Sequence, residues 1–352
     1  MQGERVSGLD GLRGIAAFAV AILYHGWLLT GPEVRAALPQ PLAWFQLWGW
    51  TFVDLFFVLS GYIFGHVYLR AGGLPEGRDF KGFAVARLAR LYPLHLAMLL
   101  VTATGFASNP DNTPLTFIAH LFMAQAFVGP VSMSFDGPSW SISVEMVCYV
   151  VFCLLALCGR RVSQVAAIVL VGVAAALQLG PEQGLGSEHI VVLARGVLGF
   201  FLGQLLWHQR ARLATCPAIL LAGGVALGLV LMDQVSNPLL PLTLLAWPAL
   251  LLLALRVPQF DAMPLRWLGE RSYALYLIHG PFFDGVGRVL GRVEHGLGAA
   301  LVYWAVMTGL VLLLSDVVLK RIERPLRSAI RAAFDRRDAR IALPAAGDTA
   351  QA

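Results

Sequence analysis

Long apolar runs recur from one end of the chain to the other, and charged residues gather in the short stretches between them. A helix that crosses a bilayer needs about 20 consecutive apolar residues, and most of the runs have about this length. The pattern predicts an all-α integral membrane protein, a bundle of about ten transmembrane helices. The spans are expected at roughly 12–30, 45–68, 91–108, 138–158, 162–180, 190–207, 216–233, 238–255, 273–290 and 297–319.

A shorter apolar stretch, 115–128, fits a re-entrant or interfacial segment better than a span. Charge supports this choice, because basic residues favour the cytoplasmic loops of membrane proteins. With ten spans and both termini in the cytoplasm, all but four of the 26 Lys and Arg residues lie inside. An extra span at 115–128 would invert every later loop. We therefore expect an inner-membrane protein with N- and C-termini cytoplasmic, a membrane domain at 1–330 and a disordered basic and polar tail at 331–352.

Composition agrees with this picture. The chain is 58% hydrophobic and 13% charged, with a mean hydropathy of +0.70, which leaves no room for a large soluble domain. The net charge of +5 does not indicate nucleic-acid binding, because topology accounts for the positions of the basic residues. The four cysteines form no CxxC pair, and we expect reduced thiols rather than a metal site or disulfides.

Ionisable side chains inside a span cost free energy unless they are paired or wet, so each one is a functional candidate. His25, Asp54, Glu145 and Arg195 all fall about 6–14 Å below the expected outer surface. An acid, a base and a cation at one depth suggest a shared polar cavity. His25 is equally explained as an interfacial histidine, and Asp54 with Arg195 as a structural ion pair.

Glu145 is harder to explain structurally, because it follows Ser139 and Trp140 in a polar turn and precedes a long apolar run. A buried carboxylate needs hydrogen-bond donors, and His25, Arg195 or the nearby serines can supply them. His279 lies inside the ninth expected span, where it either bonds within the bundle or lines a passage.

Arg87 and Arg90 lie three residues apart, and so share one face of a helix on the expected cytoplasmic side. Guanidinium groups bind phosphate oxygens in pairs, which suits a phosphorylated ligand. The tendency of arginine to stay in the cytoplasm explains the same residues without any ligand. The motifs typical of ATP-driven transport, zinc proteolysis, serine hydrolysis and dinucleotide binding are absent, and we expect no bound metal and no permanently bound cofactor.

Six stretches, in order along the chain, resemble the membrane acyltransferase-3 family. They carry the residues LDGLRGIAA with the following histidine, FVDLFFVLSGY, RLARLYP, SWSISVE, YALYLIH and IERP, at 9–25, 52–62, 87–93, 139–145, 273–279 and 322–325. The resemblance implies an acyl-CoA donor, usually acetyl-CoA, and an exported or cell-surface glycan as acceptor. It also implies that His25 is catalytic and that Arg87 and Arg90 handle the donor. Some members transfer succinyl groups or modify antibiotics.

These residues suggest a mechanism. Acyl-CoA enters from the cytoplasm, with its phosphates held by Arg13, Arg87 and Arg90. His25 takes a proton from the acceptor hydroxyl as it attacks the thioester, or carries the acyl group covalently in between. Glu145 orients His25. The oxyanion and substrate pocket is expected to include Asp54, Ser139, Trp140, Arg195 and His279.

Three rival functions remain open. A transporter or flippase for a glycan or lipid-linked sugar accommodates the same polar residues without acyl chemistry. A structural subunit of an export complex would tolerate their replacement. An acyltransferase acting on lipid differs only in its product.

Overall fold

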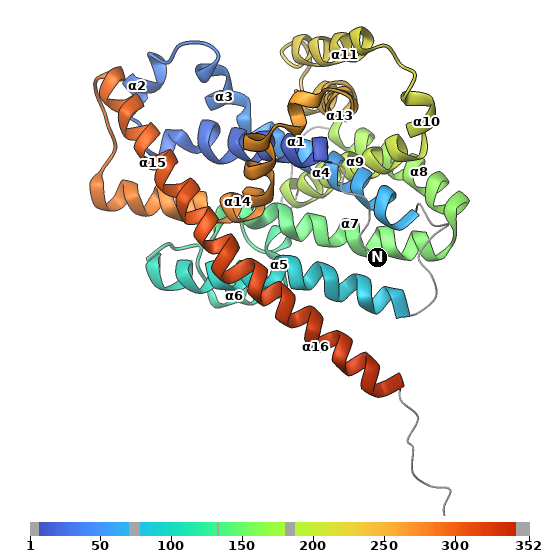
Figure 1. The fold of residues 1–352 in the computed structure, drawn as a ribbon. Coiled ribbons are helices and arrows are strands. Elements are labelled where there is room, and N and C mark those ends of the chain that lie inside the picture. The colour runs from blue at the N-terminus through green and yellow to red at the C-terminus, as the bar shows by residue number, and fades with distance from the viewer. Residues whose placement is uncertain (1–6, 70–77, 107, 132–133, 180–186, 343–352) are drawn as a thin grey trace, which may run out of the picture.

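The computed structural model describes residues 7–69, 78–106, 108–131, 134–179 and 187–342. Within these ranges the regular structure is helical, apart from one isolated bridge between Thr30 and Val293. Figure 1 shows the resulting helical bundle. The α-helices are α1 (Ser7–Phe18), α2 (Pro32–Ala36), α3 (Leu42–Trp48), α4 (Phe52–Phe64), α5 (Arg78–Gly105), α6 (Pro114–Leu121), α7 (Trp140–Leu157), α8 (Arg160–Leu179), α9 (Ser187–His208), α10 (Arg210–Leu213), α11 (Ala218–Leu231), α12 (Leu239–Pro241), α13 (Trp247–Ala254), α14 (Met263–Leu290), α15 (Leu297–Val318) and α16 (Arg324–Ala342).

Seven helical stretches among the described residues are long and apolar enough to cross a membrane. They are Gly8–Leu28, Leu42–Leu69, Lys81–Gly105, Gly137–Leu157, Arg160–Leu179, Glu188–His208 and Leu297–Arg336. The chain is thus a multi-pass, all-helical membrane protein. Three further expected spans coincide with the shorter helices Ala218–Leu231 and Leu239–Ala254 and with α14, whose first half is polar. The total of ten spans and the side on which each terminus lies stay predictions.

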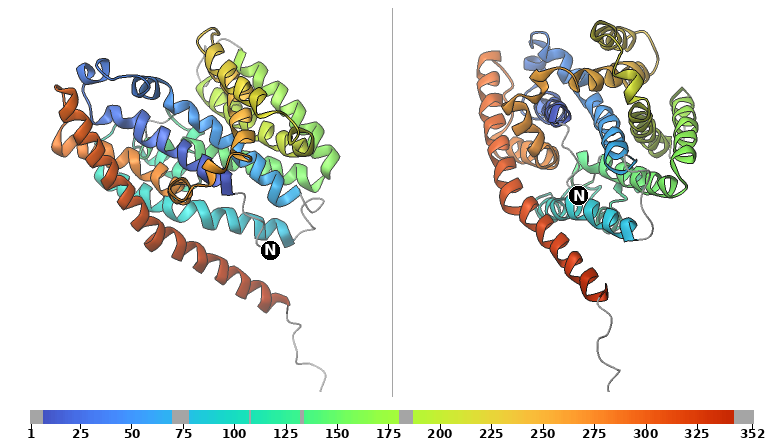
Figure 2. Two further views of the ribbon diagram at one scale, coloured as in Figure 1. Left: turned by 45° about the horizontal axis from the view of Figure 1, so that its top comes forward. Right: turned by 45° about the vertical axis from the view of Figure 1, so that its right-hand side comes forward.

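Helix α6 has eight residues, so it extends only about 12 Å along its axis. This length is well short of the membrane core and agrees with a segment that does not span. By contrast, α8 lies at the edge of the bundle beside α9 (Figure 2). Its outer face exposes Val165, Ile168 and Val169, each more than half exposed, and such a face suits lipid chains.

Glycines allow α4 and α9 to approach unusually closely. A Cβ atom on Gly61 would lie 1.7 Å from the Phe200 carbonyl oxygen, and one on Gly203 would lie 2.0 Å from that of Val58. Small residues let helix backbones touch, and dispersion contacts then hold them together in lipid. The crossing places α9 directly against the polar positions of α4.

A second close crossing joins α1 to α14. A Cβ atom on Gly14 would lie 2.7 Å from the backbone nitrogen of Gly269, and one on Gly269 would lie 1.9 Å from the Asp10 carbonyl oxygen. Two distant parts of the chain are therefore held at a fixed separation. The histidines discussed below lie further along these same two helices.

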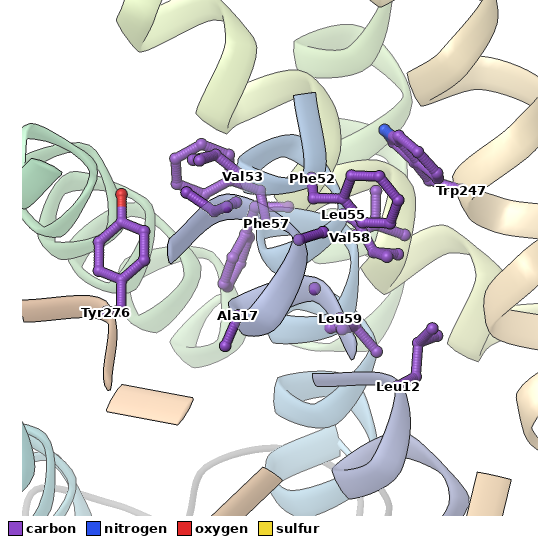
Figure 3. Close-up of a cluster of buried hydrophobic side chains, with 14 of the residues drawn as sticks. Leu12, Ala17, Phe52, Val53, Leu55, Phe57, Val58, Leu59, Trp247 and Tyr276 are labelled. Carbon is purple, nitrogen blue, oxygen red and sulfur yellow. The ribbon is translucent and has the colours of Figure 1, made fainter. Parts of the chain in front are cut away.

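The apolar core centres on α4. Figure 3 shows Phe52, Leu55 and Val58 of α4 between Trp247 of α13 on one side and Tyr276 of α14 on the other. Phe52 and Trp247 lie in ring contact, with their centroids 4.7 Å apart. Because α4 is packed on so many sides, the polar side chains that it carries are fixed in place.

Helices α15 and α16 form one long rod along the side of the bundle, and α16 passes α5 before it extends away (Figures 1 and 2). The Arg271 Nε of α14 donates to Asp316 Oδ1 of α15 over 2.7 Å and ties the rod to the bundle. The sequence pattern predicts a loose tail from residue 331, whereas α16 continues as a helix to Ala342. The end of that expected tail, 343–352, lies outside the described residues.

Candidate active site

A cavity of about 100 Å³ lies between α1, α4, α5, α7 and α14. Three arginines line it: Arg13 from α1, and Arg87 and Arg90 from α5. All three belong to the set expected to hold the acyl donor, and the fold brings them together. Arginines from two helices thus line one cavity. The preference of basic residues for the cytoplasmic side does not by itself require this arrangement.

The three arginines are held to different degrees. Arg87 donates from Nη2 to the Tyr68 hydroxyl over 3.1 Å, and its guanidinium lies 5.0 Å from the centre of the Phe64 ring. Arg13 pairs with Asp10 at 2.9 Å. Arg90 is not tied by a hydrogen bond in the described part of the chain, and its charge acts on the buried Glu323 carboxylate. The cavity therefore combines two guanidinium groups held by hydrogen bonds or an ion pair with one that is held less tightly.

Glu145 lines this same cavity from α7. Its Oε1 accepts a hydrogen bond from Ser60 Oγ over 2.8 Å and another from the Tyr149 hydroxyl. These two hydroxyls supply the donors that a buried carboxylate needs. The expected contact between Glu145 and His25 is not among the contacts of the described residues, so Glu145 belongs to the arginine cavity.

His25 lies where the first helix changes its form. The chain runs as a π-helical turn over Ala19–Tyr24 and as a 3₁₀ turn over His25–Leu28. Such turns are frequent at functional sites, because they redirect side chains and release carbonyl groups. The Val20 carbonyl oxygen accepts the backbone N–H of His25 and also lies 3.0 Å from His25 Nδ1.

Packing fixes this irregular turn. The Trp304 Nε1 of α15 donates to the Ile22 carbonyl oxygen over 3.1 Å. A Cβ atom on Gly26 would lie 2.3 Å from the Trp304 ring, so only glycine fits there. The Trp304 indole N–H and the missing side chain at Gly26 together let α15 pack closely against the helix beside His25.

The ring partner of His25 is His279 of α14. His25 Nδ1 and His279 Nε2 are 3.0 Å apart, and the ring centres are 4.6 Å apart. His279 is completely buried, and its Nδ1 lies 3.2 Å from the Leu275 carbonyl oxygen. Two residues expected in one site are thus in direct contact across 254 positions of sequence.

Tyr276 links the arginine cavity to the histidine pair. Its ring lines the cavity and lies 5.8 Å from that of His279, one turn further along α14. Its hydroxyl donates to the Pro138 carbonyl oxygen over 2.8 Å and lies 3.0 Å from Ser141 Oγ. Tyr276 and Ser141 are absent from the residues predicted from sequence. The spacing of three between Tyr276 and His279, which places them on one helix face, is the signal that could have identified the tyrosine.

Asp54 and Arg195 form a buried ion pair with two hydrogen bonds, the shorter being 2.7 Å between Arg195 Nη2 and Asp54 Oδ2. The Arg195 guanidinium also lies 4.9 Å from the Trp50 ring centre and 5.0 Å from that of Trp140. The pair that the sequence suggests is therefore formed. Arg195 is fully engaged by these partners and, like Trp140, is not part of the cavity wall.

Ser139 supports the loop that leads into α7. It is completely buried, and its hydroxyl donates to the Asp136 carbonyl oxygen over 2.6 Å. Gln125 Nε2 donates to the Ser139 carbonyl oxygen over 2.7 Å. The Asp136 carboxylate accepts no hydrogen bond from a described residue, and its burial raises the pKa of Asp136 well above the ordinary value. These contacts use the Ser139 hydroxyl within the loop, and its expected role as a donor to an oxyanion stays a prediction.

The described part of the chain contains neither a metal-binding cluster nor a disulfide. No group of three His, Cys, Asp or Glu side chains there is arranged to hold a metal ion. All four cysteines are free thiols; Cys148 and Cys153 are buried, whereas Cys158 is exposed.

Comparison with known proteins adds independent information. The chain is 26% identical over 345 residues to BcsY of Komagataeibacter xylinus, which is named as a membrane-bound transacylase; the match covers 90% of this chain and 83% of that protein. It is 25% identical over 403 residues to YrhL of Bacillus subtilis, named as a peptidoglycan O-acetyltransferase, with 94% of this chain and 56% of the relative covered. The chain thus spans little more than half of YrhL.

No solved structure matches the chain. The sequence model of an acyltransferase domain, the acyltransferase-3 model, matches residues 6–320. This region contains the arginine cavity, both histidines and the Asp54–Arg195 pair. The chain therefore belongs to the membrane acyltransferase-3 family.

Proposed function

We propose that this protein moves an acyl group, most simply acetyl, from acyl-CoA to a hydroxyl of an exported or cell-surface glycan. The observation that carries the proposal is the cavity lined by Arg13, Arg87 and Arg90, which Tyr276 connects to the His25–His279 pair. Coenzyme A carries a pyrophosphate and a further phosphate, and guanidinium groups bind such oxygens well. Family membership supplies the acyl chemistry.

The proposed orientation follows from the charge pattern. Basic residues favour the cytoplasmic side, so the arginine end of the cavity faces the cytoplasm, where acyl-CoA is made. Both termini then lie in the cytoplasm, and the protein sits in the inner membrane. The histidine pair lies toward the outer side, where an exported glycan can reach it.

His25 serves as the general base in this proposal. It removes the proton from the acceptor hydroxyl while that oxygen attacks the thioester carbonyl, which typically accelerates a reaction about 10²–10⁴-fold. The carbon–sulfur bond then breaks, and the thiolate of CoA takes up the proton. Transfer through an acyl-histidine uses the same residue as a nucleophile instead.

The name of one relative supports a glycan acceptor. YrhL is named for transfer to peptidoglycan, whose sugars carry free hydroxyls. The proposal extends this acceptor class to the present chain. A lipid hydroxyl remains the alternative acceptor, and product analysis distinguishes the two.

The test is acyl transfer by the purified protein in lipid nanodiscs, supplied with radiolabelled acetyl-CoA and muropeptides. We expect label to move to the muropeptides and free CoA to appear. His25→Ala should abolish both while the protein remains monodisperse and helical. A transporter without acyl chemistry would leave acetyl-CoA intact. Full activity of His25→Ala would remove His25 from the mechanism.

A companion measurement addresses the acceptor in cells. Mass spectrometry of surface glycans, with and without the gene, should show acyl groups that disappear on deletion and return with the wild-type gene but not with His25→Ala. Acyl groups that disappear from lipids instead would replace the glycan by a lipid acceptor.

A further inference from the structure

The hydrogen bonds of His279 determine which of its ring nitrogens carries a proton. Its Nδ1 lies 3.2 Å from the Leu275 carbonyl oxygen, which can only accept. Nδ1 must therefore be the protonated nitrogen for this bond to exist. A neutral imidazole has one N–H group, so His279 Nε2 presents a lone pair.

The same reasoning then applies to His25. Its Nδ1 faces two acceptors, the Val20 carbonyl oxygen and His279 Nε2, each at 3.0 Å. Only a protonated Nδ1 satisfies either one. These contacts assign the proton on His25 to Nδ1 and leave Nε2 as the nitrogen with a free lone pair.

We propose that His279 is the positioning residue of His25: its Nε2 lone pair holds His25 in the tautomer whose Nε2 acts as the base. The proposal rests on the proposed role of His25 in acyl transfer. It gives His279 the task that a carboxylate performs in catalytic triads, and that the sequence suggests for Glu145. Glu145 is occupied by Ser60 and Tyr149 instead.

The proton transfers balance in this arrangement. His25 Nε2 accepts the proton of the acceptor hydroxyl, the new carbon–oxygen bond forms and the carbon–sulfur bond breaks. The proton then passes from His25 Nε2 to the departing thiolate. Throughout, the His25 Nδ1–H bond points at His279 Nε2, which shares the positive charge of the transient imidazolium without accepting a proton.

The structure also explains how the pair keeps its geometry. The α1–α14 crossing at Gly14 and Gly269 fixes the distance between the two helices. The π-helical turn places the Val20 carbonyl oxygen 3.0 Å from His25 Nδ1, and complete burial of His279 excludes water as a competing partner. A hydrogen bond in such a dry site is stronger than one in water.

A purely structural contact between two helices would have the same distance, so the test must separate the two roles. The variants are His279→Gln, whose amide oxygen can still accept from His25 Nδ1, and His279→Phe, which cannot. His120→Gln is the matched control, because His120 is a buried histidine that bonds to Ser134 away from this site.

The first measurement is ¹⁵N NMR of histidine-labelled full-length protein in nanodiscs, with His25 assigned by its loss in His25→Ala. We expect a protonated Nδ1 and an unprotonated Nε2 in the wild type, and a mixture of tautomers in His279→Phe. The reverse tautomer of His25, or unchanged His25 signals in His279→Phe, would overturn the proposal. This readout does not depend on acyl transfer, so it stands apart from failure of the proposed function.

The second measurement is acyl transfer. We expect His279→Phe to lower kcat by roughly 10²-fold or more with unchanged acetyl-CoA affinity, and His279→Gln to recover much of that loss. His120→Gln should retain wild-type kcat. Equal rates for His279→Gln and His279→Phe, in variants that remain helical, would reduce His279 to a packing residue.

Discussion

Asp54 and Arg195 show how a single pair of charges is accommodated at membrane depth. Both side chains are at least nine-tenths buried, and Trp50 and Trp140 contact the guanidinium from the remaining sides. An ion pair with this many partners is tolerated, whereas one buried charge alone is costly. Because the pair is not part of the cavity wall, these contacts favour a structural role.

A double-mutant cycle tests that role. Asp54→Leu alone leaves Arg195 without its counter-charge, so we expect a loss of about 3–5 kcal/mol in unfolding free energy. Adding Arg195→Met should restore most of the stability, because an apolar pair needs no compensation. Thermal unfolding in detergent measures both, and acyl transfer by the restored variant shows whether the charges also serve catalysis. A double variant as unstable as Asp54→Leu would contradict this interpretation.

At the scale of helices, two glycine-lined crossings determine where the buried polar side chains meet. The α4–α9 crossing brings Arg195 to Asp54, and the α1–α14 crossing brings His279 to His25. Polar contacts accompany both crossings, but they require that the helix backbones first come close. Each crossing depends on the absence of a side chain where two backbones touch, which is the usual basis of helix association in lipid.

Replacing such a glycine by alanine should therefore destabilise the fold far more than the addition of one methyl group usually does. A Cβ atom on Gly203 would lie 2.0 Å from the Val58 carbonyl oxygen, so Gly203→Ala must force α4 and α9 apart. We expect a lower Tm and a loss of acyl transfer. Gly172→Ala in α8 is the control: nothing lies within 4 Å of its Cβ position, and alanine favours helix by about 1 kcal/mol. A Tm for Gly203→Ala at or above that of Gly172→Ala would refute the argument.

At the scale of the whole molecule, the proposed function makes the arginine cavity and the histidine pair two ends of one site. The arginines should act on the donor and not on the acceptor. We expect Arg87→Ala with Arg90→Ala to weaken acetyl-CoA binding by about tenfold or more, since a hydrogen bond to a charged group contributes about 1.5–3 kcal/mol. The apparent affinity for muropeptides should change little.

Binding of CoA by calorimetry and the KM for muropeptides provide the two measurements. Arg288→Ala is the matched control, because Arg288 is an exposed arginine that pairs with Asp284 outside the cavity. If the double variant binds CoA as tightly as the wild type, Arg87 and Arg90 do not bind the donor and serve only to orient the helix in the membrane.

Much of this architecture could be predicted from the sequence, and the reason is physical. Apolar length identifies membrane helices, and burial cost singles out the ionisable residues within them, which is how His25, Asp54, Glu145 and Arg195 are found. Periodicity along a chain carries no information on which helices are neighbours. For this reason Glu145 is expected beside His25, whereas the fold places His279 there and Glu145 with Ser60.

The hydrophobic pattern of the sequence also does not predict the local form of the backbone. The sequence predicts one regular span at 12–30, but the helix changes to a π-helical and then a 3₁₀ turn around His25. Apolar residues satisfy all three forms equally well. The decisive contacts come from Trp304, which lies 282 positions away from the carbonyl group that it binds.

The small volume of the cavity has a consequence for entry of the donor. Pockets that enclose a small-molecule ligand commonly measure about 300–1,000 Å³, whereas this cavity measures about 100 Å³. In the proposed function, the pantetheine arm of the donor therefore requires the surrounding helices to separate before it enters. In the proposed function, packed aromatic rings such as Tyr276 then separate the donor side of the cavity from the histidine pair until the donor binds.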